Sequence, residues 1–580
     1  MTPRSMLITA LVAAGAFSVA LAVTQSRQHT SSDTLSTPAS DASPADSTTS
    51  DPLQFPADDF TVETVTVKTA SGEQQVTVHS YKHIPYVANP VDADYQSLDV
   101  QVPVAINGQP LDAGAAPVLL NIKIGGYRSV NNANPDQGFG GRRGGEGKGR
   151  PAPGEGRAQE RVQGTAHGMQ AGLEVPAEGF GPRDGGRKGR DGPDAKGPGP
   201  QRGARMGEGM GSDKAQLALA AGYVVVTPGA RGIDNVNAEG IYYGTAPAGI
   251  VDLKAAVRYI RHNDAVMAGN ANWIVSAGCS AGGAMSALLG ASGNQDWYAP
   301  YLKALGAADE PDNIFASACY SPITDLDHAD MSYEWMFGNQ PLRGELVDQQ
   351  VSGQLQQQYR VYQSELALQG HHGFGVLTAD NYADYLKQQY LQPIATAYIR
   401  KLDDEAQQQY LTDNSWIRWD GQQADFDFAD YVADFGRMKG APSFDSFELS
   451  TPENQLFGLD NQRANHFTAF SQDYNSASEA PLADELQQRV NMMNPMYFAT
   501  APKDQSRSDI APHWWLRNGS HDNNNAAVVM FNLALGLEQQ GVDVNTALFW
   551  EGGHCADDDP QGMVDWIAAI TGYKAGSAGQ

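Results

Sequence analysis

The strongest constraint on the fold is a segment near the middle of the chain, where a strand pattern, a glycine-rich turn and a helix pattern follow one another. Residues 273–277 are apolar enough for a buried strand, residues 278–282 read Gly-Cys-Ser-Ala-Gly, and a helix pattern continues through Leu289. Such a turn holds the serine in a strained conformation, and bulky neighbours would collide with the adjacent strand and helix. The segment predicts an α/β fold with Ser280 as a nucleophile.

Two loops near the end of the chain supply an acid and a base. Residues 514–516 have the pattern of a strand and are followed by Asp522, and residues 542–550 have the pattern of a second strand followed by His554. Folds with this serine turn place their acid, and then their histidine, on later loops just past strand ends. The chain therefore predicts an α/β-hydrolase core with the triad Ser280, Asp522 and His554. The alternatives are that Asp522 only caps the next helix and that His554 is an ordinary loop residue.

Ester hydrolysis assigns a task to each of these side chains and requires two further hydrogen-bond donors. The histidine has to take the serine proton and return one to the leaving alcohol, while the aspartate fixes the imidazole tautomer. The N–H of Ala281 is expected to bind the oxyanion. A second N–H is expected from the Gly-Gly-Tyr turn after the strand at 118–124, where Gly126 is preferred to Tyr127. A tight turn without catalytic duty is the alternative.

The chain has three cysteines, and two of them flank the expected catalytic residues. Cys279 precedes the serine and Cys555 follows the histidine, and these two regions must meet for the triad to work. A Cys279–Cys555 disulfide is therefore expected in an oxidising compartment, where it would tether the histidine loop to the serine turn. Two unlinked buried thiols are the alternative, and Cys319 is expected to be a small buried residue.

Longer stretches of the chain resemble bacterial tannases, within the tannase and feruloyl esterase-like serine hydrolases. Tannases share with feruloyl esterases the Cys-Ser and His-Cys pairs with an aspartate between them. The similar stretches are residues 276–294, 301–307, 321–324 with 327–330, and 452–458. The resemblance covers most of the chain from about residue 60 onward, apart from a long insertion, and it implies hydrolysis of galloyl esters.

The resemblance also implies a binding site for the galloyl ring. Lys439 and Glu453 match family positions that bind the ring hydroxyls, a role that suits a donor and an acceptor facing adjacent phenols. Ile323 and Pro452 match positions that sandwich the ring between apolar walls. Asn524 stands where the family usually has a second acidic residue, so galloyl esters are expected to bind differently or less tightly here.

Composition and pattern divide the chain into segments. Arg4, an apolar run over 6–23 and the site Ala20-Leu21-Ala22 indicate a cleavable signal peptide, with an uncleaved membrane anchor as the alternative. Past the middle of the chain strand patterns give way to helical ones, which predicts an inserted lid. The expected segments are a signal peptide at 1–22, a disordered linker at 23–58, a hydrolase core at 59–325 and 493–580, and a mainly helical lid domain at 326–492.

Charge argues against one class of partner. The formal net charge is -28, which disfavours nucleic acid. The Gly- and Arg-rich insertion at about 138–211 departs from this balance and is expected to be a disordered surface loop, with stacking on polyphenols or adhesion to an anionic surface as alternatives. The acidic run at 325–330 is more typical of helix caps and dipole partners than of metal ligands, so no metal is assigned.

Together these features predict an exported serine esterase, periplasmic or extracellular, that cleaves galloyl esters through an acyl-enzyme. Its expected partner is a small phenolic ester, with no cofactor, no nucleic acid and no stable membrane association after signal cleavage. A feruloyl or general phenolic carboxylesterase is the nearest alternative. A non-catalytic binding protein on a hydrolase fold is a more distant one, because the chain has a complete triad.

Overall fold

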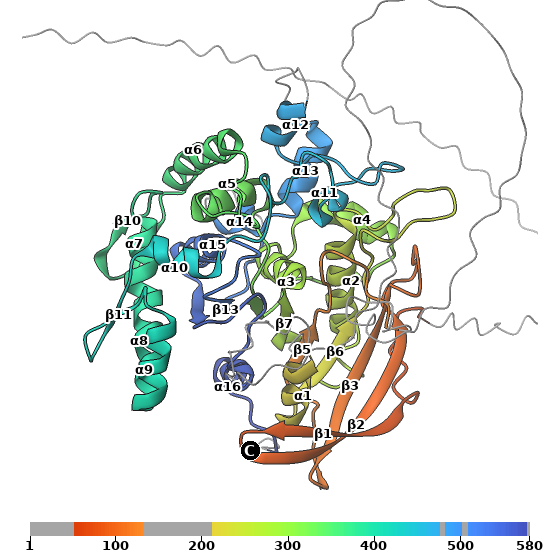
Figure 1. Ribbon diagram of the computed structural model, residues 1–580. Helices are drawn as coiled ribbons and strands as arrows, with labels where there is room; N and C mark the ends of the chain where they lie inside the picture. Colours follow the sequence, from red (N-terminus) through yellow and green to blue (C-terminus); the bar gives the residue numbers. More distant parts are fainter. Residues whose placement is uncertain (1–50, 133–211, 476–481, 502–507, 577–580) are drawn as a thin grey trace, which may run out of the picture. The chain divides into compact units, whose positions relative to one another are not determined.

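Ten strands form one mixed sheet in the computed structural model, which describes residues 51–132, 212–475, 482–501 and 508–576 (Figure 1). The strands are β1 (Thr61–Thr69), β2 (Gly72–Pro85), β3 (Ser97–Ile106), β4 (Gln109–Pro110), β5 (Val118–Asn121), β6 (Val224–Pro228), β7 (Ile274–Cys279), β8 (Ala316–Tyr320), β13 (His513–Gly519) and β14 (Asp543–Phe549). Their order is β1-β2-β3-β6-β5-β7-β8-β13-β14, with β4 paired to β3. Strands from β6 to β14 in this order run parallel, and β1, β2 and β3 add an antiparallel edge.

Helices cover both faces of the sheet, so the central strands are apolar on both sides. Along β5, Val118 and Leu120 belong to one buried core and Leu119 to the other, as the two-residue period of a strand requires. One face is covered by α1 (Ser212–Ala220) and α16 (Pro560–Thr571), and the other by α2 (Ala248–His262), α3 (Ala281–Ala291), α4 (Ala299–Ala304) and α15 (Ala527–Gln539). The predicted α/β-hydrolase core is confirmed by this arrangement.

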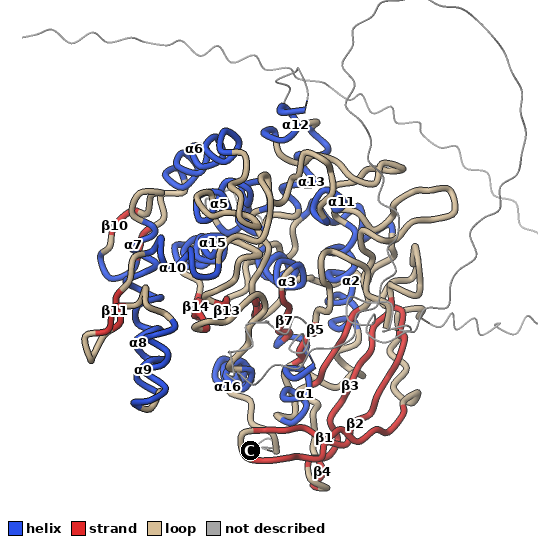
Figure 2. The backbone as a smooth tube through the Cα atoms, in the orientation of Figure 1, coloured by secondary structure: helices blue, strands red, loops and turns tan. Residues whose placement is uncertain are grey.

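Between β8 and β13 the chain is mainly helical, as the sequence predicts, with two short strand pairs (Figure 2). Its helices are α5 (Leu326–Phe337), α6 (Gln349–Glu365), α7 (Tyr382–Leu386), α8 (Gln392–Lys401), α9 (Asp404–Asp413), α10 (Phe428–Phe435), α11 (Pro452–Leu456), α12 (Ala469–Asn475), α13 (Asp484–Met492) and α14 (Pro495–Ala499). The strand pairs are β9 (Gln369–Gly370) with β10 (Gly375–Val376), and β11 (Arg418–Trp419) with β12 (Ala424–Asp425). Buried side chains of this insert and of α15 form one continuous apolar core, so the described residues from 51 onward make a single compact unit.

The structure differs from the expected linker at the C-terminal end of that segment. The expected signal peptide, the expected linker up to residue 50 and the Gly- and Arg-rich insertion lie outside the described residues. Residues 51–58, expected to be part of the linker, instead pack on the core, where the side chains of Leu53 and Phe55 are buried. The side-chain amide of Asn263 accepts the N–H of Phe55 and donates to the carbonyl of Leu53. Across the described ranges, no helix has the length and apolarity needed to span a membrane.

Candidate active site

The serine lies in a strained turn between β7 and α3. Its backbone has φ 59° and ψ -125°, a region that side-chain-bearing residues rarely adopt. A Cβ on Gly278 would lie 2.3 Å from the carbonyl oxygen of Gly282, and a Cβ on Gly282 would lie 2.7 Å from that of Ile124. A side chain at either glycine of the Gly-x-Ser-x-Gly motif would therefore collide with the neighbouring backbone. Glycine allows β7, the turn and α3 to pack closely, and this packing holds Ser280 at the strand end.

The structure brings the three residues of the predicted triad into one hydrogen-bonded series. The Nε2 atom of His554 lies 2.9 Å from the Oγ atom of Ser280. Its Nδ1 atom lies 2.9 Å and 3.2 Å from the two carboxylate oxygens of Asp522. The aspartate side chain is fully buried, whereas that of the histidine is 14% exposed. Since α15 begins after Ala526, Asp522 does not cap that helix.

Electrostatics favour an ionised aspartate. Burial raises the pKa of Asp522, but the imidazole of His554, the N–H of Asn524 and the hydroxyl of Ser321 lower it further, so the net shift is downward. An ionised carboxylate accepts the Nδ1 proton and leaves Nε2 free to accept the serine proton. The arrangement is chemically able to turn the Ser280 hydroxyl into a nucleophile.

Two main-chain segments expected to bind an oxyanion flank the serine. Ala281 is the first residue of α3, where N–H groups lack partners within the helix. Gly126 has φ 56°, in a loop whose preceding residue Ile124 packs against the start of α3. Tyr127 follows with φ 56°, and its hydroxyl donates to the carbonyl of Ile323 at 2.9 Å. The Gly-Gly-Tyr turn is thus bonded to the segment after β8 that carries Ile323.

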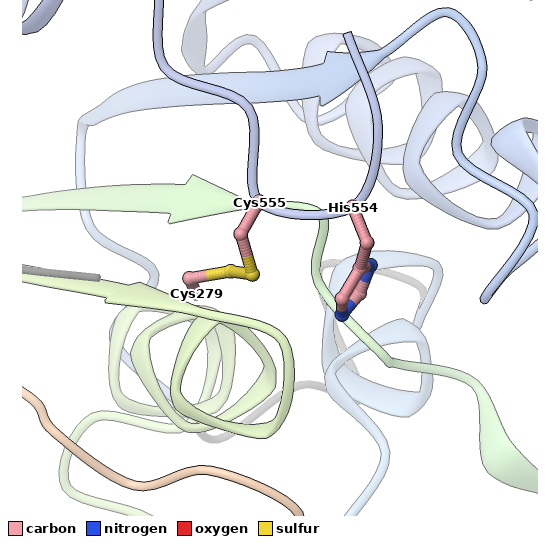
Figure 3. A group of neighbouring side chains, drawn as sticks. All are labelled: Cys279, His554 and Cys555. Atoms are coloured by element: carbon pink, nitrogen blue, oxygen red, sulfur yellow. A yellow bond between two sulfur atoms is a disulfide. The ribbon is translucent and has the colours of Figure 1, made fainter. Parts of the chain in front are cut away.

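A disulfide joins Cys279 to Cys555, as the sequence predicts, with the two Cα atoms 5.8 Å apart (Figure 3). His554 is next to this bond, so the loop that carries His554 is covalently tied to the end of β7. The bonded sulfurs are not available as thiolate ligands to a metal. Cys319 is a free, buried thiol, and burial raises its pKa to about 12.

The pKa of Lys439 and the pKa of Glu453 each depend on the charge of the other side chain. Glu453 is the second residue of α11 and is 7% exposed, and Lys439 is half-buried in the loop after α10. Burial lowers the pKa of Lys439, and the charges of Glu453, Asp330 and Asp522 only partly offset this effect. Burial raises the pKa of Glu453, and Lys439 opposes this shift. Lys439 thus interacts electrostatically both with Glu453 and with Asp522 of the predicted triad.

The remaining residues expected to contact the substrate differ in exposure. Ile323 is buried, with its N–H donating to the carbonyl of Ser280 at 3.3 Å, whereas Pro452 is exposed at the start of α11. Asn524 is half-buried, and its N–H donates to Asp522 at 2.9 Å. Asn524 is thus in the same loop as Asp522, two residues after it, and its side chain is a neutral amide.

Of the two roles expected for the acidic run at 325–330, Asp327 in the first turn of α5 fits that of a dipole partner, whereas Asp325 does not cap the helix. Asp325 is at the N-cap position of α5, but its side chain makes no cap hydrogen bond. Instead its carboxylate contacts His328 Nδ1 at 2.9 Å, the hydroxyl of Tyr362 at 2.5 Å and the amide of Asn494 at 2.9 Å. A left-handed backbone at Asp325 turns the side chain away from the helix N–H groups and toward these partners.

Two residues that support the site were not predicted from the sequence. Ser321, directly after β8, accepts the N–H of Cys555 at 3.0 Å and also bonds Asp522. Tyr333 of α5 contacts both the aspartate loop and the segment of Lys439. A serine past a strand end was a signal that could have been used, whereas a tyrosine on a helix is usually an ordinary core residue.

Fold and site together define the protein as a carboxylic ester hydrolase with an α/β-hydrolase core. Residues 203–361 match the BD-FAE family. The native structure of tannin acyl hydrolase from Lactobacillus plantarum is similar, with 31% sequence identity and a TM-score of 0.68, over 89% of this chain and 98% of that chain. Tannin acyl hydrolase in complex with ethyl gallate gives the same values.

Fusobacterium nucleatum tannase is also similar, with 29% identity and a TM-score of 0.67 over 89% of this chain and 99% of that chain. The chain belongs to the tannase family. The resemblance found in the sequence is thereby confirmed. No curated protein sequence matches the chain.

Proposed function

We propose that this protein is an exported serine esterase that hydrolyses galloyl esters, such as those of hydrolysable tannins, and releases gallic acid through an acyl-enzyme. The observation that carries the proposal is the hydrogen-bonded series Ser280–His554–Asp522, together with Lys439, which interacts electrostatically with both Asp522 and Glu453. The similarity to tannin acyl hydrolase in complex with ethyl gallate supports the same acyl group.

The proposed reaction has two halves. In the first, Ser280 Oγ bonds to the ester carbonyl carbon while its proton passes to His554 Nε2, and the N–H groups of Ala281 and Gly126 bind the oxyanion. Collapse breaks the bond to the alcohol, which leaves with the proton from His554. In the second half, water attacks the acyl-enzyme and gives its proton to the same nitrogen. Gallic acid is then released, and Ser280 regains its proton.

The acyl group is proposed to be recognised through its ring hydroxyls. Adjacent phenols donate to the carboxylate of Glu453, and the ammonium of Lys439 donates to a phenolic oxygen. Ile323 and Pro452 form apolar walls on the two faces of the ring. Asn524 supplies a neutral acceptor at a position where a carboxylate would bind the ring hydroxyls more strongly. This weaker binding favours a general phenolic carboxylesterase as the second candidate function.

Export is part of the proposal. The apolar run at 6–23 supports a signal peptide at 1–22, and the Cys279–Cys555 disulfide supports an oxidising compartment outside the cytoplasm. We also propose that the mainly helical insert at 326–492 is a lid domain of the catalytic core. Its residues Lys439 and Glu453 would then give the lid a direct part in substrate binding.

Two measurements test the proposed function. Methyl gallate should be hydrolysed with a kcat/KM at least about 100-fold above that for methyl ferulate, because a buried carboxylate that loses its hydroxyl partners penalises the poorer match. A preference for ferulate would instead support a feruloyl esterase. An organophosphate should label Ser280 at one equivalent per chain, detected by mass spectrometry, and not label Ser280→Ala. Absence of labelling would support the non-catalytic alternative.

A further inference from the structure

One buried tyrosine hydroxyl joins the loop of the triad aspartate to the segment that carries Lys439. Tyr333 of α5 is 0% exposed. Its hydroxyl donates to the main-chain carbonyl of Asn523 at 2.8 Å, and it accepts the N–H groups of Met438 and Lys439 at 3.0 Å and 3.2 Å. A phenol oxygen has one proton and two lone pairs, so these three bonds use its whole hydrogen-bonding capacity.

The ring of Tyr333 supports the same lysine by a second route. It packs edge-on against the ring of Phe444, with centroids 6.2 Å apart. The ammonium of Lys439 lies 3.7 Å from the centroid of that Phe444 ring, a cation–π distance. Lys439 is therefore held at both ends, its main chain by the tyrosine hydroxyl and its ammonium by a ring that packs on the tyrosine.

Neighbouring contacts leave the lysine segment little freedom. Arg437 pairs at 2.6 Å with Glu334, the residue after Tyr333 on α5, and both charged side chains are fully buried. The same guanidinium donates to two main-chain carbonyls just after it in the segment. From the opposite side, the side-chain amide of Asn523 donates to two carbonyls just ahead of Arg437, each at 3.2 Å. The aspartate loop and the lysine segment are thus bonded to each other as well as to α5.

We propose that Tyr333 is a positioning residue that sets the place of Lys439 relative to the triad, and thereby the preference for acyl groups with ring hydroxyls. The inference rests on the proposed function, in which Lys439 binds a galloyl hydroxyl. Loss of the tyrosine hydroxyl would remove the three bonds through which α5 holds Asn523, Met438 and Lys439 in register. The bonds from His554 to Ser280 and Asp522 do not involve Tyr333, so the chemical step itself would remain.

The test compares phenyl gallate with phenyl benzoate, because their leaving groups are identical and their acyl groups differ only in the ring hydroxyls. Tyr333→Phe leaves two N–H groups and one carbonyl without their partner. We expect kcat/KM for phenyl gallate to fall about tenfold, mainly through KM, and that for phenyl benzoate to change less than about twofold. The gallate-to-benzoate ratio of kcat/KM therefore reports positioning, which a general loss of stability would not change selectively.

Tyr359→Phe is the matched control. The Tyr359 hydroxyl is also fully buried in the helical insert, but it donates to Gln363 at 3.0 Å rather than to the lysine segment. This variant should lower the melting temperature and leave the gallate-to-benzoate ratio unchanged. If both tyrosine variants lower the ratio equally, the effect belongs to insert stability and the inference is overturned.

Lys439→Ala separates failure of this inference from failure of the proposed function. If Lys439→Ala leaves the ratio unchanged, the lysine does not bind ring hydroxyls, and the proposed function loses its basis. If Lys439→Ala lowers the ratio but Tyr333→Phe does not, the positioning role alone is refuted. In the double variant the two effects should not add, and additive effects would contradict the inference. Should Tyr333→Phe fail to fold, Phe444→Leu, which removes the ring that packs on Tyr333 and contacts the Lys439 ammonium, must lower the ratio for the inference to stand.

Discussion

Replacing the triad aspartate by its neutral isostere tests the proposed mechanism most directly. In Asp522→Asn the volume is kept, but the amide presents an N–H group where the carboxylate accepts the Nδ1 proton of His554 at 2.9 Å. The imidazole would then turn to its other tautomer, with the proton on Nε2, which faces Ser280 Oγ at 2.9 Å. A protonated Nε2 donates to the serine and is unable to accept its proton.

The structure makes this change severe because the aspartate side chain is fully buried and bonds the imidazole directly. In serine hydrolases with the same geometry, the wrong tautomer lowers kcat about 10⁴-fold. We expect a loss of this order in kcat for methyl gallate, measured by release of gallic acid at neutral pH. The KM should change little, because Asp522 is not proposed to contact the acyl group.

A second aspartate–histidine pair supplies the control. Asp543 and His513 are 2.9 Å apart at the amino ends of β13 and β14, the opposite ends of these strands from the triad. Asp543→Asn makes the same chemical change and should keep kcat within about twofold, because surface pairs contribute little. A loss below tenfold in Asp522→Asn, with the variant folded, would refute the tautomer argument and the triad with it.

Three further predictions concern stability, the cross-link and specificity. Burial lowers the pKa of His328, but the charges of Asp327 and Asp325 raise it well above its ordinary value. The stabilisation from these ion pairs is therefore complete below about pH 6.5 and is lost as pH rises through the raised pKa. His328→Gln should destabilise the protein more at pH 6 than at pH 10, and equal losses in denaturant melts would contradict this. Reduction of the Cys279–Cys555 disulfide, which joins positions 276 residues apart, should lower the free energy of unfolding by up to about 5 kcal/mol and should lower activity. Full activity and an unchanged melting temperature, with all three thiols titratable, would contradict this prediction. Asn524→Asp should raise kcat/KM for methyl gallate about fivefold by adding a charged acceptor, and no gain would place the ring hydroxyls elsewhere.

Much of the catalytic core could be predicted because its signals are local. The strand, turn and helix around Ser280 occupy one short stretch, and the strands before Asp522 and His554 each have a clear apolar pattern. A parallel sheet brings the carboxyl ends of its strands to one edge, so the three loops were expected to meet. The disulfide followed from the same reasoning, because its cysteines are next to the serine and the histidine.

The sequence by itself determined the kind of fold, the order of its catalytic loops and the family, since hydrophobic period, turn glycines and motif spacing are properties of neighbouring residues. Only the tertiary structure decided which groups hold those loops in place. Tyr333 meets Asn523 across 190 positions of sequence, and Asp325 turns to His328 and Asn494 instead of capping its helix. Such contacts depend on how the insert packs on the core, and hydrogen-bond partners far apart in the chain leave no periodic pattern from which to infer them.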